Sequence, residues 1–354
     1  MICDKDNTAI VIKNVFSSLQ DEISRVIFLS RLSYYLSEDE RHLHDMLKMV
    51  DHMGDNDNQT LLDFLENTEL HQREIILYGA GSFGGTLLTD FSEKQIRVSF
   101  FCDSDKSKQG KQNHGVYVIS PEELVSNHLD AIVVVSTKLF FDEIFLYLAE
   151  IGFPSSQIYV LGNFNEAYFG ERFLRPVENE VYIDTGVYDG YTIKRFMHFC
   201  GDRYKRIFGL EPDPNNWQKV EEWLVNGGVD ERISLIQKGA WNCNAVLSFN
   251  SFDQDSSITE TGVLKVEVAP VDELIEDEAV TLIKMDIEGS ELKALEGAQN
   301  TIKKHKPRLA ISVYHKPEDI LEIPLYIQSL VPEYRFYLRH HNAIFTDTVF
   351  YAVL

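Results

Sequence analysis

Ionisable residues cluster directly after one predicted strand in the C-terminal half of the chain. The run Val280–Met285 is apolar enough for a buried strand, and Asp286-Ile287-Glu288-Gly289 follows it. Because side chains alternate along a strand, we expect Lys284, Asp286 and Glu288 to lie on one side of the backbone. A lysine between two carboxylates is costly to bury without a function or a full set of partners. The pattern therefore indicates a catalytic or binding cluster, with a structural ion-pair cluster as the alternative.

A histidine follows the next predicted strand. Leu309–Tyr314 reads as a strand, and His315 comes directly after it. In a parallel sheet, functional side chains come from the carboxyl ends of neighbouring strands. An imidazole with a pKa near neutrality suits the removal of a proton from a hydroxyl group. We predict that His315 acts as a general base or orients the substrate. Asp286 and Glu288 would fix either the substrate or the positively charged end of a cofactor, and Lys284 would keep these carboxylates ionised.

A glycine-bearing turn earlier in the chain predicts a nucleoside-type cofactor. A short strand, Val181–Ile183, runs into Asp184-Thr185-Gly186, and Gly190 precedes a segment with helical apolar spacing. Backbone amides at such a helix start face a ligand at the edge of the sheet. About twenty residues later a second strand, Ile207–Leu210, ends in Glu211, where a ribose diol is bound in folds of this type. Any tight turn uses glycines, but the acidic strand end at this distance favours cofactor binding.

Further strands and helices would position these residues in an α/β domain. The other strands are predicted at Ile233–Lys238 (followed by Ala240 and Trp241), Tyr334–Leu338 and Thr348–Val353, and the helices at Ser290–Ile302 and Pro317–Leu330. Two alternating runs, Ala245–Asn250 and Leu264–Val268, predict an inserted antiparallel pair with the loop Ser251–Gly262 over the cleft. Seven main strands with a final hairpin is the strand count of a nucleoside-cofactor methyltransferase domain.

A separate unit, Glu74–Gly162, carries a second glycine motif. The strand Ile75–Tyr78 precedes Gly79-Ala80-Gly81-Ser82-Phe83-Gly84, and a second strand, Val98–Cys102, ends at Asp103. We predict a small doubly wound half-domain. It either binds a nucleotide, of the NAD or nucleotide-sugar type, through Gly79, Gly81, Gly84 and Asp103, or keeps the scaffold without a ligand. A working dehydrogenase is disfavoured, because the histidines of this unit lie in predicted loops.

The first 70 residues predict helices. Apolar residues recur at three- and four-residue steps between Val15 and Ile27 and again between Leu43 and Val50, and Leu61–Leu65 is a further short helix. Such stripes form either a packed face or a surface through which the chain self-associates into a homo-oligomer. The expected organisation is a helical segment at 1–70, a Rossmann-like domain at 71–165 and a second Rossmann-like domain at 175–354.

Composition limits the classes of partner. The chain has 354 residues and a net charge of −23, from 33 basic and 56 acidic residues. This charge disfavours nucleic acid and an anionic membrane surface. The four cysteines are far apart in the sequence, so we expect free thiols in a reducing compartment. No leader and no apolar run of about 20 residues is evident, so we expect a cytoplasmic protein without a membrane span.

Six successive motifs of the C-terminal half resemble those of the FkbM-type methyltransferases. They are Asp184–Gly190, Gly209–Asp213, Ile283–Glu291, Leu295–Ala298, Ser312–Asp319 and Tyr337–His341. Together they cover about residues 180–354 in order. The resemblance implies a seven-stranded class I fold that binds S-adenosylmethionine and transfers its methyl group, commonly to a hydroxyl of a sugar or natural product. The first domain is similar to nucleotide-binding-type modules that precede such enzymes in polysaccharide pathways.

The resemblance also implies roles for individual residues. Asp184, Thr185, Gly186 and Gly190 would line the methionine and ribose portions of the cofactor, Glu211 with Asp213 the ribose, and Ala240-Trp241 the adenine. Tyr188 stands where a middle glycine is common, and Asp347 stands in place of a glutamate. Oxygen ligands on Asp286 and Glu288 would suit Mg²⁺, but we expect no divalent metal. The rival hypothesis is a protein that binds NAD or a nucleotide-sugar through its first domain and transfers no methyl group.

Overall fold

The computed structural model describes residues 5–53, 72–93, 95–136, 141–160, 168–201, 203–227, 230–250, 257–258, 264–275, 278–341 and 346–354. The chain divides into two compact units. The first combines residues 1–46, 168–340 and 345–354, and the second comprises 47–167 and 341–344. The first unit therefore joins the start of the chain to its C-terminal half.

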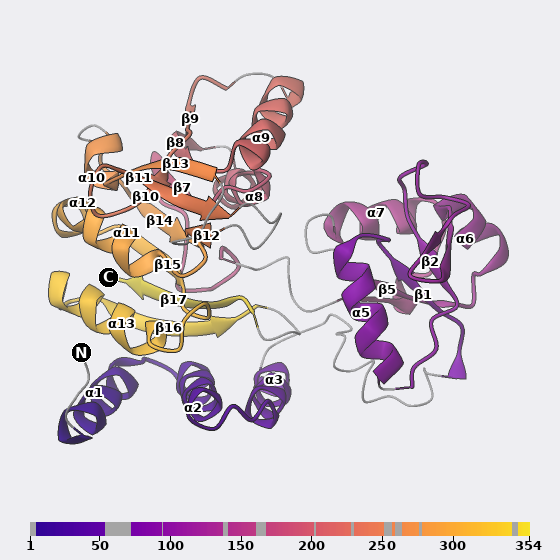
Figure 1. Ribbon diagram of the computed structural model, residues 1–354, viewed down its shortest axis with the longest axis horizontal. Helices are drawn as coiled ribbons and strands as arrows, with labels where there is room; N and C mark the ends of the chain where they lie inside the picture. The colour runs from indigo at the N-terminus through magenta and orange to yellow at the C-terminus, as the bar shows by residue number, and fades with distance from the viewer. Residues whose placement is uncertain are drawn as a thin grey trace. The chain divides into compact units, whose positions relative to one another are not determined.

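A seven-stranded sheet forms the centre of the first unit (Figure 1). Its strands are β7 (Glu180–Thr185), β8 (Tyr204–Leu210), β9 (Ile233–Ile236), β14 (Leu282–Met285), β15 (Arg308–Ser312), β16 (Arg335–His340) and β17 (Thr348–Val353). They lie in the order β16-β17-β15-β14-β7-β8-β9, and only β17 runs antiparallel to its neighbours. The strand order reverses between β7 and β14, which is where ligands bind in open α/β sheets. The α/β fold class expected from the sequence is confirmed.

Strand register brings the ends of the central strands together. Lys284 on β14 pairs with Asp184 on β7, and Thr185 pairs with Leu210 on β8. Because these strands are parallel, the residues that follow them leave the sheet at one edge. The residues after β14 and β15 leave at the same edge, since Met285 pairs with Ile311. The predicted site residues are thus brought to one edge by backbone pairing.

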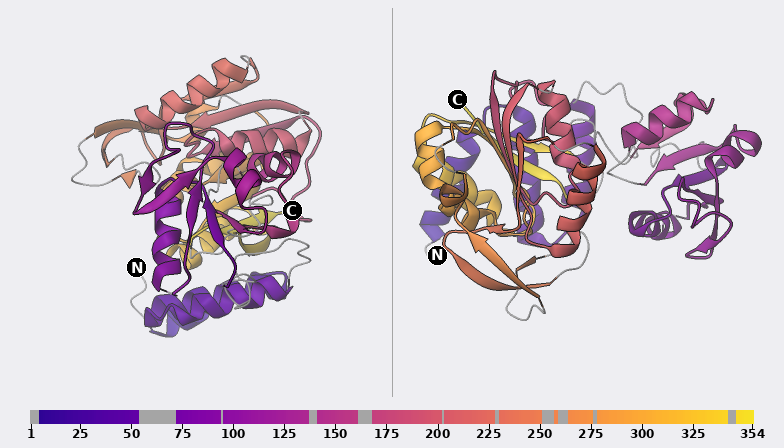
Figure 2. Two further views of the ribbon diagram at one scale, coloured as in Figure 1. Left: turned by 90° about the vertical axis from the view of Figure 1, so that its right-hand side faces the viewer. Right: turned by 90° about the horizontal axis from the view of Figure 1, so that it is seen from above.

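Helices cover both faces of this sheet. Figure 2 shows α8 (Tyr191–Cys200) and α9 (Pro214–Gly227) on one face, with α11 (Glu291–Gly297), α12 (Gln299–His305) and α13 (Asp319–Leu330) on the other. The expected helix Ser290–Ile302 is divided at Ala298, whose backbone φ and ψ are −109° and 6°. This division fits tight packing, since a Cβ on Gly297 would lie 1.9 Å from the carbonyl oxygen of Trp241.

A smaller sheet is inserted between β9 and β14. It consists of β10 (Gly239–Ala240), β11 (Ala245–Asn250), β12 (Ser257–Ile258) and β13 (Leu264–Ala269), and the short helix α10 (Val271–Leu274) follows it. β11 and β13 pair antiparallel from Ala245↔Val268 to Phe249↔Leu264, so the expected inserted pair is confirmed. The predicted loop Ser251–Gly262 lies mostly outside the described residues.

The N-terminal helix α1 (Lys5–Ser18) packs against α13, and α2 (Glu22–Ser37) packs against β16. Leu19 forms a backbone bridge with Phe336, and the Arg339 guanidinium donates to Asp21, the N-cap of α2, at 2.7 Å. Arg339 also donates to Glu171 at 2.9 Å. The face of α2 that contacts β16 is therefore covered within this chain, and self-association through these helices stays a prediction.

Helix α3 (Arg41–Met53) completes the expected N-terminal helices, while the predicted helix Leu61–Leu65 lies outside the described residues. Three of its apolar side chains, Leu43, Met46 and Leu47, are buried, which agrees with the apolar stripe read from the sequence. In the described part of the chain, no helix is both long enough and apolar enough to cross a membrane.

The second unit contains a six-stranded sheet of order β3-β4-β2-β1-β5-β6. Its elements are β1 (Ile75–Tyr78), α5 (Ser82–Glu93), β2 (Phe100–Cys102), β3 (Gln112–Asn113), β4 (Val116–Ile119), α6 (Pro121–Asn127), β5 (Ile132–Val135), α7 (Phe141–Glu150) and β6 (Ile158–Val160). Five of the strands are parallel, and β3 pairs antiparallel with β4. Apolar clusters lie on both faces, one with Leu87 and Phe91 of α5 and one with Leu124 of α6 and Leu148 of α7. Strand order and two covered faces make this a doubly wound sheet.

Removing the Arg339 side chain should loosen the attachment of α2. Arg339 is 13% exposed and its two carboxylate partners are partly buried, so we expect Arg339→Ala to lower the free energy of unfolding by about 1–3 kcal/mol. The three tryptophans, Trp217, Trp223 and Trp241, all lie in the first unit, so tryptophan fluorescence during denaturant unfolding reports on this unit.

Arg335→Ala on the same strand is the control, because the Arg335 side chain is exposed. It should change the free energy of unfolding by less than about 0.5 kcal/mol. Equal midpoints for Arg339→Ala and the parent protein would contradict the prediction.

Candidate functional site

A buried ion pair joins the two central strands of the sheet. The Lys284 ammonium lies 3.1 Å from the Asp184 carboxylate, and the exposed fractions of the two side chains are 2% and 0%. Lys284 also donates to the carbonyl oxygen of Gly186 at 2.8 Å, and Thr192 of α8 donates to Asp184. Asp184 raises the pKa of Lys284 although burial opposes this change. The pair therefore ties β14, the turn after β7 and the start of α8 together.

The turn after β7 needs glycine at two positions. Gly186 has φ +81°, and a Cβ there would lie 2.1 Å from the carbonyl oxygen of Asp286. Gly190 has φ +86° at the N-cap of α8, and a Cβ there would contact Trp223 at 2.8 Å. Tyr188 also has a positive φ, +57°, which is uncommon for a residue with a side chain. The turn predicted from the sequence thus requires backbone conformations that favour glycine.

Glu211, at the end of β8, holds the same turn from the other side. Its carboxylate accepts from the backbone amides of Tyr188 and Asp213, both at 2.9 Å. Burial raises the pKa of Glu211 to about 7, although these two amides lower it. Each carboxylate oxygen has one amide donor and retains a further lone pair, so the group can still accept from two hydroxyls of a ribose.

Other residues predicted to contact the cofactor lie around this turn. Thr185 is buried, and its hydroxyl donates to the carbonyl oxygen of Lys284 at 3.1 Å. Asp213 is buried and accepts from the amide of Asn215 at the start of α9. Ala240 is buried in β10, while Trp241 is half-buried and packs against the inserted sheet. These contacts describe how the residues support the backbone, and their contact with a cofactor stays a prediction.

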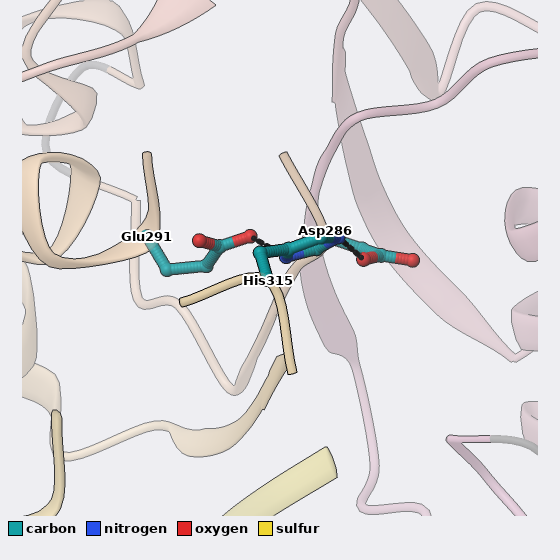
Figure 3. A group of neighbouring side chains, drawn as sticks. All are labelled: Asp286, Glu291 and His315. Atoms are coloured by element: carbon teal, nitrogen blue, oxygen red, sulfur yellow. Dashed lines mark ion pairs between the residues drawn. The ribbon is translucent and has the colours of Figure 1, made fainter. Parts of the chain in front are cut away.

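His315, which follows β15, lies among three carboxylates, and Figure 3 shows two of them, Asp286 and Glu291. Its Nδ1 is 3.0 Å from Glu291, and its Nε2 is 3.5 Å from Asp286 and 3.4 Å from Glu288. The exposed fraction of the imidazole is 8%, and that of Glu291 is 0%. The structure thus brings together three of the predicted site residues and adds Glu291, which the sequence analysis treated only as part of a motif.

The pKa of His315 differs from the near-neutral value expected from the sequence. Burial lowers it, but the contacts with Glu288 and Glu291 and the charges of Glu291 and Asp286 raise it further, to about 11. The ligand-free protein therefore carries a protonated imidazole at neutral pH. A protonated imidazole cannot accept a proton, so this state favours orientation of a substrate over general-base catalysis.

Two tyrosines to which the sequence analysis gave no role contact Asp286. The hydroxyl of Tyr168 donates to one carboxylate oxygen at 2.8 Å, and that of Tyr314 donates to the other at 3.2 Å. Burial raises the pKa of Asp286, but the charges of Lys284 and His315 lower it further, so the group stays ionised. Tyr314 adjoins His315 in the sequence, whereas Tyr168 lies in the connector before β7, where no sequence pattern indicated a role.

The expected alternation of Lys284, Asp286 and Glu288 does not hold. Strand β14 ends at Met285, and Glu288 has φ +54°, so the backbone turns before it reaches Glu288. Lys284 forms its ion pair with Asp184 on the neighbouring strand. The charge of Lys284 still lowers the pKa of Asp286, which agrees with the expectation that Lys284 keeps a neighbouring carboxylate ionised.

In the second unit, the glycine motif and Asp103 lie together as the sequence predicts. The amide of Ala80 donates to Asp103 at 2.8 Å, and Lys108 forms an ion pair with the same oxygen at 3.0 Å. A Cβ on Gly84 would lie 2.1 Å from the carbonyl oxygen of Gly79, whereas one on Gly81 would meet nothing within 4 Å. Asp103 thus already has partners within the chain, and a nucleotide at this motif stays a prediction.

Substituting Gly186 should strongly destabilise the first unit. Gly186→Ala adds a clash with a backbone oxygen to the strain of a positive φ, so we expect a loss of more than about 3 kcal/mol in the free energy of unfolding. The matched control is Gly201→Ala at the C-cap of α8, where φ is +57° and the added Cβ would meet only Arg203 at 3.9 Å. That variant should lose about 1 kcal/mol. Tryptophan fluorescence during denaturation measures both, and equal losses would contradict the prediction.

The raised pKa of Glu211 predicts a pH dependence of stability. Since the folded protein holds this proton up to about pH 7 and the unfolded chain releases it near pH 4.5, stability should fall as pH rises between these values and then level off. Glu211→Gln removes this contribution, which is on the order of 3 kcal/mol.

The measurement is the difference in the free energy of unfolding between the parent and Glu211→Gln at pH 5 and pH 8. Glu221→Gln, at an exposed position on α9, is the control and should show no such difference. If this difference is the same at pH 5 and pH 8, Glu211 is not the source of the pH dependence of stability.

Two known domain families match parts of the sequence. Residues 184–343 match the family described as the methyltransferase FkbM domain, and residues 71–159 match a family described as C2185-like, N-terminal. No curated protein matches the sequence significantly.

Several solved structures are similar to the chain. An FkbM methyltransferase from Methylobacillus flagellatus KT is 24% identical, with 79% of this chain and 90% of that chain covered and a TM-score of 0.47. A putative methyltransferase from Streptococcus mutans in complex with SAH is 14% identical, with 50% and 90% covered and a TM-score of 0.33. Fibrillarin from Aeropyrum pernix with bound S-adenosyl-L-methionine is 13% identical, with 53% and 73% covered and a TM-score of 0.36.

The family match spans the glycine turn, Glu211 and the His315 cluster in one continuous segment. Residues 184–343 thus match the methyltransferase FkbM domain, the family that the sequence motifs resemble.

Proposed function

We propose that this protein transfers the methyl group of S-adenosylmethionine to a hydroxyl oxygen of a sugar, a polysaccharide or a related small molecule. The observation that carries the proposal is the shared sheet edge, where the β7 turn and Glu211 lie beside Asp286 and His315. The first pair suits a nucleoside cofactor and the second a polar acceptor. For methyl transfer, the methyl group of the donor must lie next to the acceptor oxygen, and this sheet edge is where the two groups of residues adjoin.

On the cofactor side, Glu211 accepts from the ribose hydroxyls and the turn from Gly186 to Gly190 supplies close backbone approach. The Asp184–Lys284 pair is fully buried, so we assign it the role of holding this turn rather than touching the cofactor. Ala240 and Trp241 remain the residues proposed to lie near the adenine.

On the acceptor side, Asp286, Glu288 and His315 orient the attacking oxygen. The reaction is an in-line displacement in which the oxygen attacks the sulfonium methyl group while its proton leaves to a neighbouring base. Alignment of the two substrates supplies up to about 7–11 kcal/mol of the lowered barrier in favourable cases. Carboxylates and an imidazole around the acceptor support a polyol, whose hydroxyls both donate and accept hydrogen bonds.

Calorimetric titration with S-adenosylmethionine tests the cofactor assignment. The parent should bind it, and Glu211→Ala should weaken binding by about tenfold or more, because hydrogen bonds to a charged group contribute about 1.5–3 kcal/mol. Glu221→Ala should bind as the parent does. Circular dichroism and the fluorescence unfolding midpoint show that each variant is folded.

Methyl transfer is then measured as release of S-adenosylhomocysteine in the presence of sugar nucleotides and glycans. A parent protein that does not bind S-adenosylmethionine would exclude the proposed function. Binding without product on any hydroxyl acceptor would exclude the O-methylation part.

A further inference from the structure

Three side chains at the sheet edge are arranged as ligands of one cation. Asp286 follows β14, Glu291 is the first residue of α11, and His315 follows β15. One nitrogen or oxygen from each lies within 4.8 Å of the others. Figure 3 shows the imidazole between the two carboxylates. The segment from the end of β14 to the start of α11 and the end of β15 thus bring one ligand atom each from three side chains close together.

The charges around His315 do not balance. Asp286, Glu288 and Glu291 all lie within 3.5 Å of its ring nitrogens, so three carboxylates surround one imidazole. Lys284 is already paired with Asp184 and with the carbonyl oxygen of Gly186. Excess negative charge at a site this buried is costly unless a further cation compensates it.

Within the described part of the chain, several nitrogen and oxygen atoms of this cluster that could bind a metal ion form no hydrogen bond. One oxygen of Glu291 accepts from the amide of Ile287 at 2.9 Å, while its other oxygen, fully buried, has no hydrogen-bond partner among the described residues. The two ring nitrogens of His315, which is 8% exposed, contact carboxylates without the geometry of a hydrogen bond. The distance of 3.0 Å between Nδ1 of His315 and a Glu291 oxygen matches neighbouring ligand atoms of one ion, which lie about 3.0–3.4 Å apart when the bonds are about 2.1 Å long.

We propose that Asp286, Glu291 and His315 bind a divalent first-row transition ion, Mn²⁺ or Zn²⁺, which replaces the proton on the ligating imidazole nitrogen. A histidine nitrogen with two carboxylates favours these ions over Mg²⁺ and Ca²⁺, which prefer oxygen ligands throughout. Tyr168 and Tyr314 hold the Asp286 carboxylate, and the Ile287 amide holds Glu291, as outer contacts do around metal ligands. The proposal departs from the sequence expectation of no metal, which considered only oxygen ligands.

The ion site extends the proposed function, because it lies where we place the acceptor. A bound divalent ion would lower the pKa of a hydroxyl that coordinates it and so prepare the oxygen for attack on the methyl group. Ion binding itself does not require methyl transfer, so the two proposals are tested separately.

The experiment titrates chelator-treated, desalted full-length protein with MnCl₂, following the free ion by electron paramagnetic resonance, and with ZnCl₂ by calorimetry. The parent should bind one equivalent of at least one of these ions. Asp286→Asn, Glu291→Gln and His315→Gln should each weaken binding at least tenfold. Glu296→Gln is the matched control, because Glu296 lies on the same helix but pairs at the surface with Lys293 and Asn242.

Variants are compared only when they keep the circular dichroism spectrum of the parent. Because three ligands are substituted independently, the test still works if one variant fails to fold. A parent that binds neither ion would overturn the proposal, as would variants that bind as tightly as Glu296→Gln. S-adenosylmethionine is titrated into the same samples. Cofactor binding without ion binding removes only the ion site, whereas ion binding without cofactor binding removes only the methyltransferase assignment.

Discussion

The buried pair between Lys284 and Asp184 is the interaction on which the site depends. It places a full positive and a full negative charge at the switch point of the sheet, where neither is exposed to solvent. Breaking one partner of a buried pair leaves an uncompensated charge, which costs about 3–5 kcal/mol. Because the same ammonium binds the carbonyl oxygen of Gly186, the pair also sets the path of the turn that Glu211 holds through Tyr188. Strand pairing, turn and helix start are thus coupled through one side chain.

Charge divides this sheet edge into two regions. On the side of β7 and β8, the positive charge of Lys284 offsets Asp184, and Glu211 has a pKa of about 7 because it is buried. On the side of β15, three carboxylates surround one imidazole. The positive sulfonium of the methyl donor would lie between a nearly balanced region and a negative one. In the proposed function, this difference in charge would draw the sulfonium group toward the acceptor, and the same excess of negative charge motivates the proposed ion.

The start of the chain is part of the first unit, which carries the candidate site. Helix α2 packs on β16, and its N-cap, Asp21, pairs with Arg339 near the other end of the sequence. The edge strand of an open sheet exposes backbone groups that pair readily with other chains, and covering it is one way proteins avoid such pairing. The helices therefore protect the sheet edge formed by the last strands, a role that the apolar stripe alone could not distinguish from self-association.

The sequence by itself determined the elements and the strand ends that carry chemistry. Apolar runs, glycine turns and acidic strand ends are local patterns, and they located β7, β8, β14 and the glycine turn at Gly186 within a few residues. Tertiary structure decided which groups meet. Lys284 pairs across the sheet with Asp184 rather than along its own strand, Tyr168 reaches Asp286 from a connector, and three carboxylates raise the pKa of His315. Charge interactions depend on distance and burial in space, which spacing along a chain does not specify.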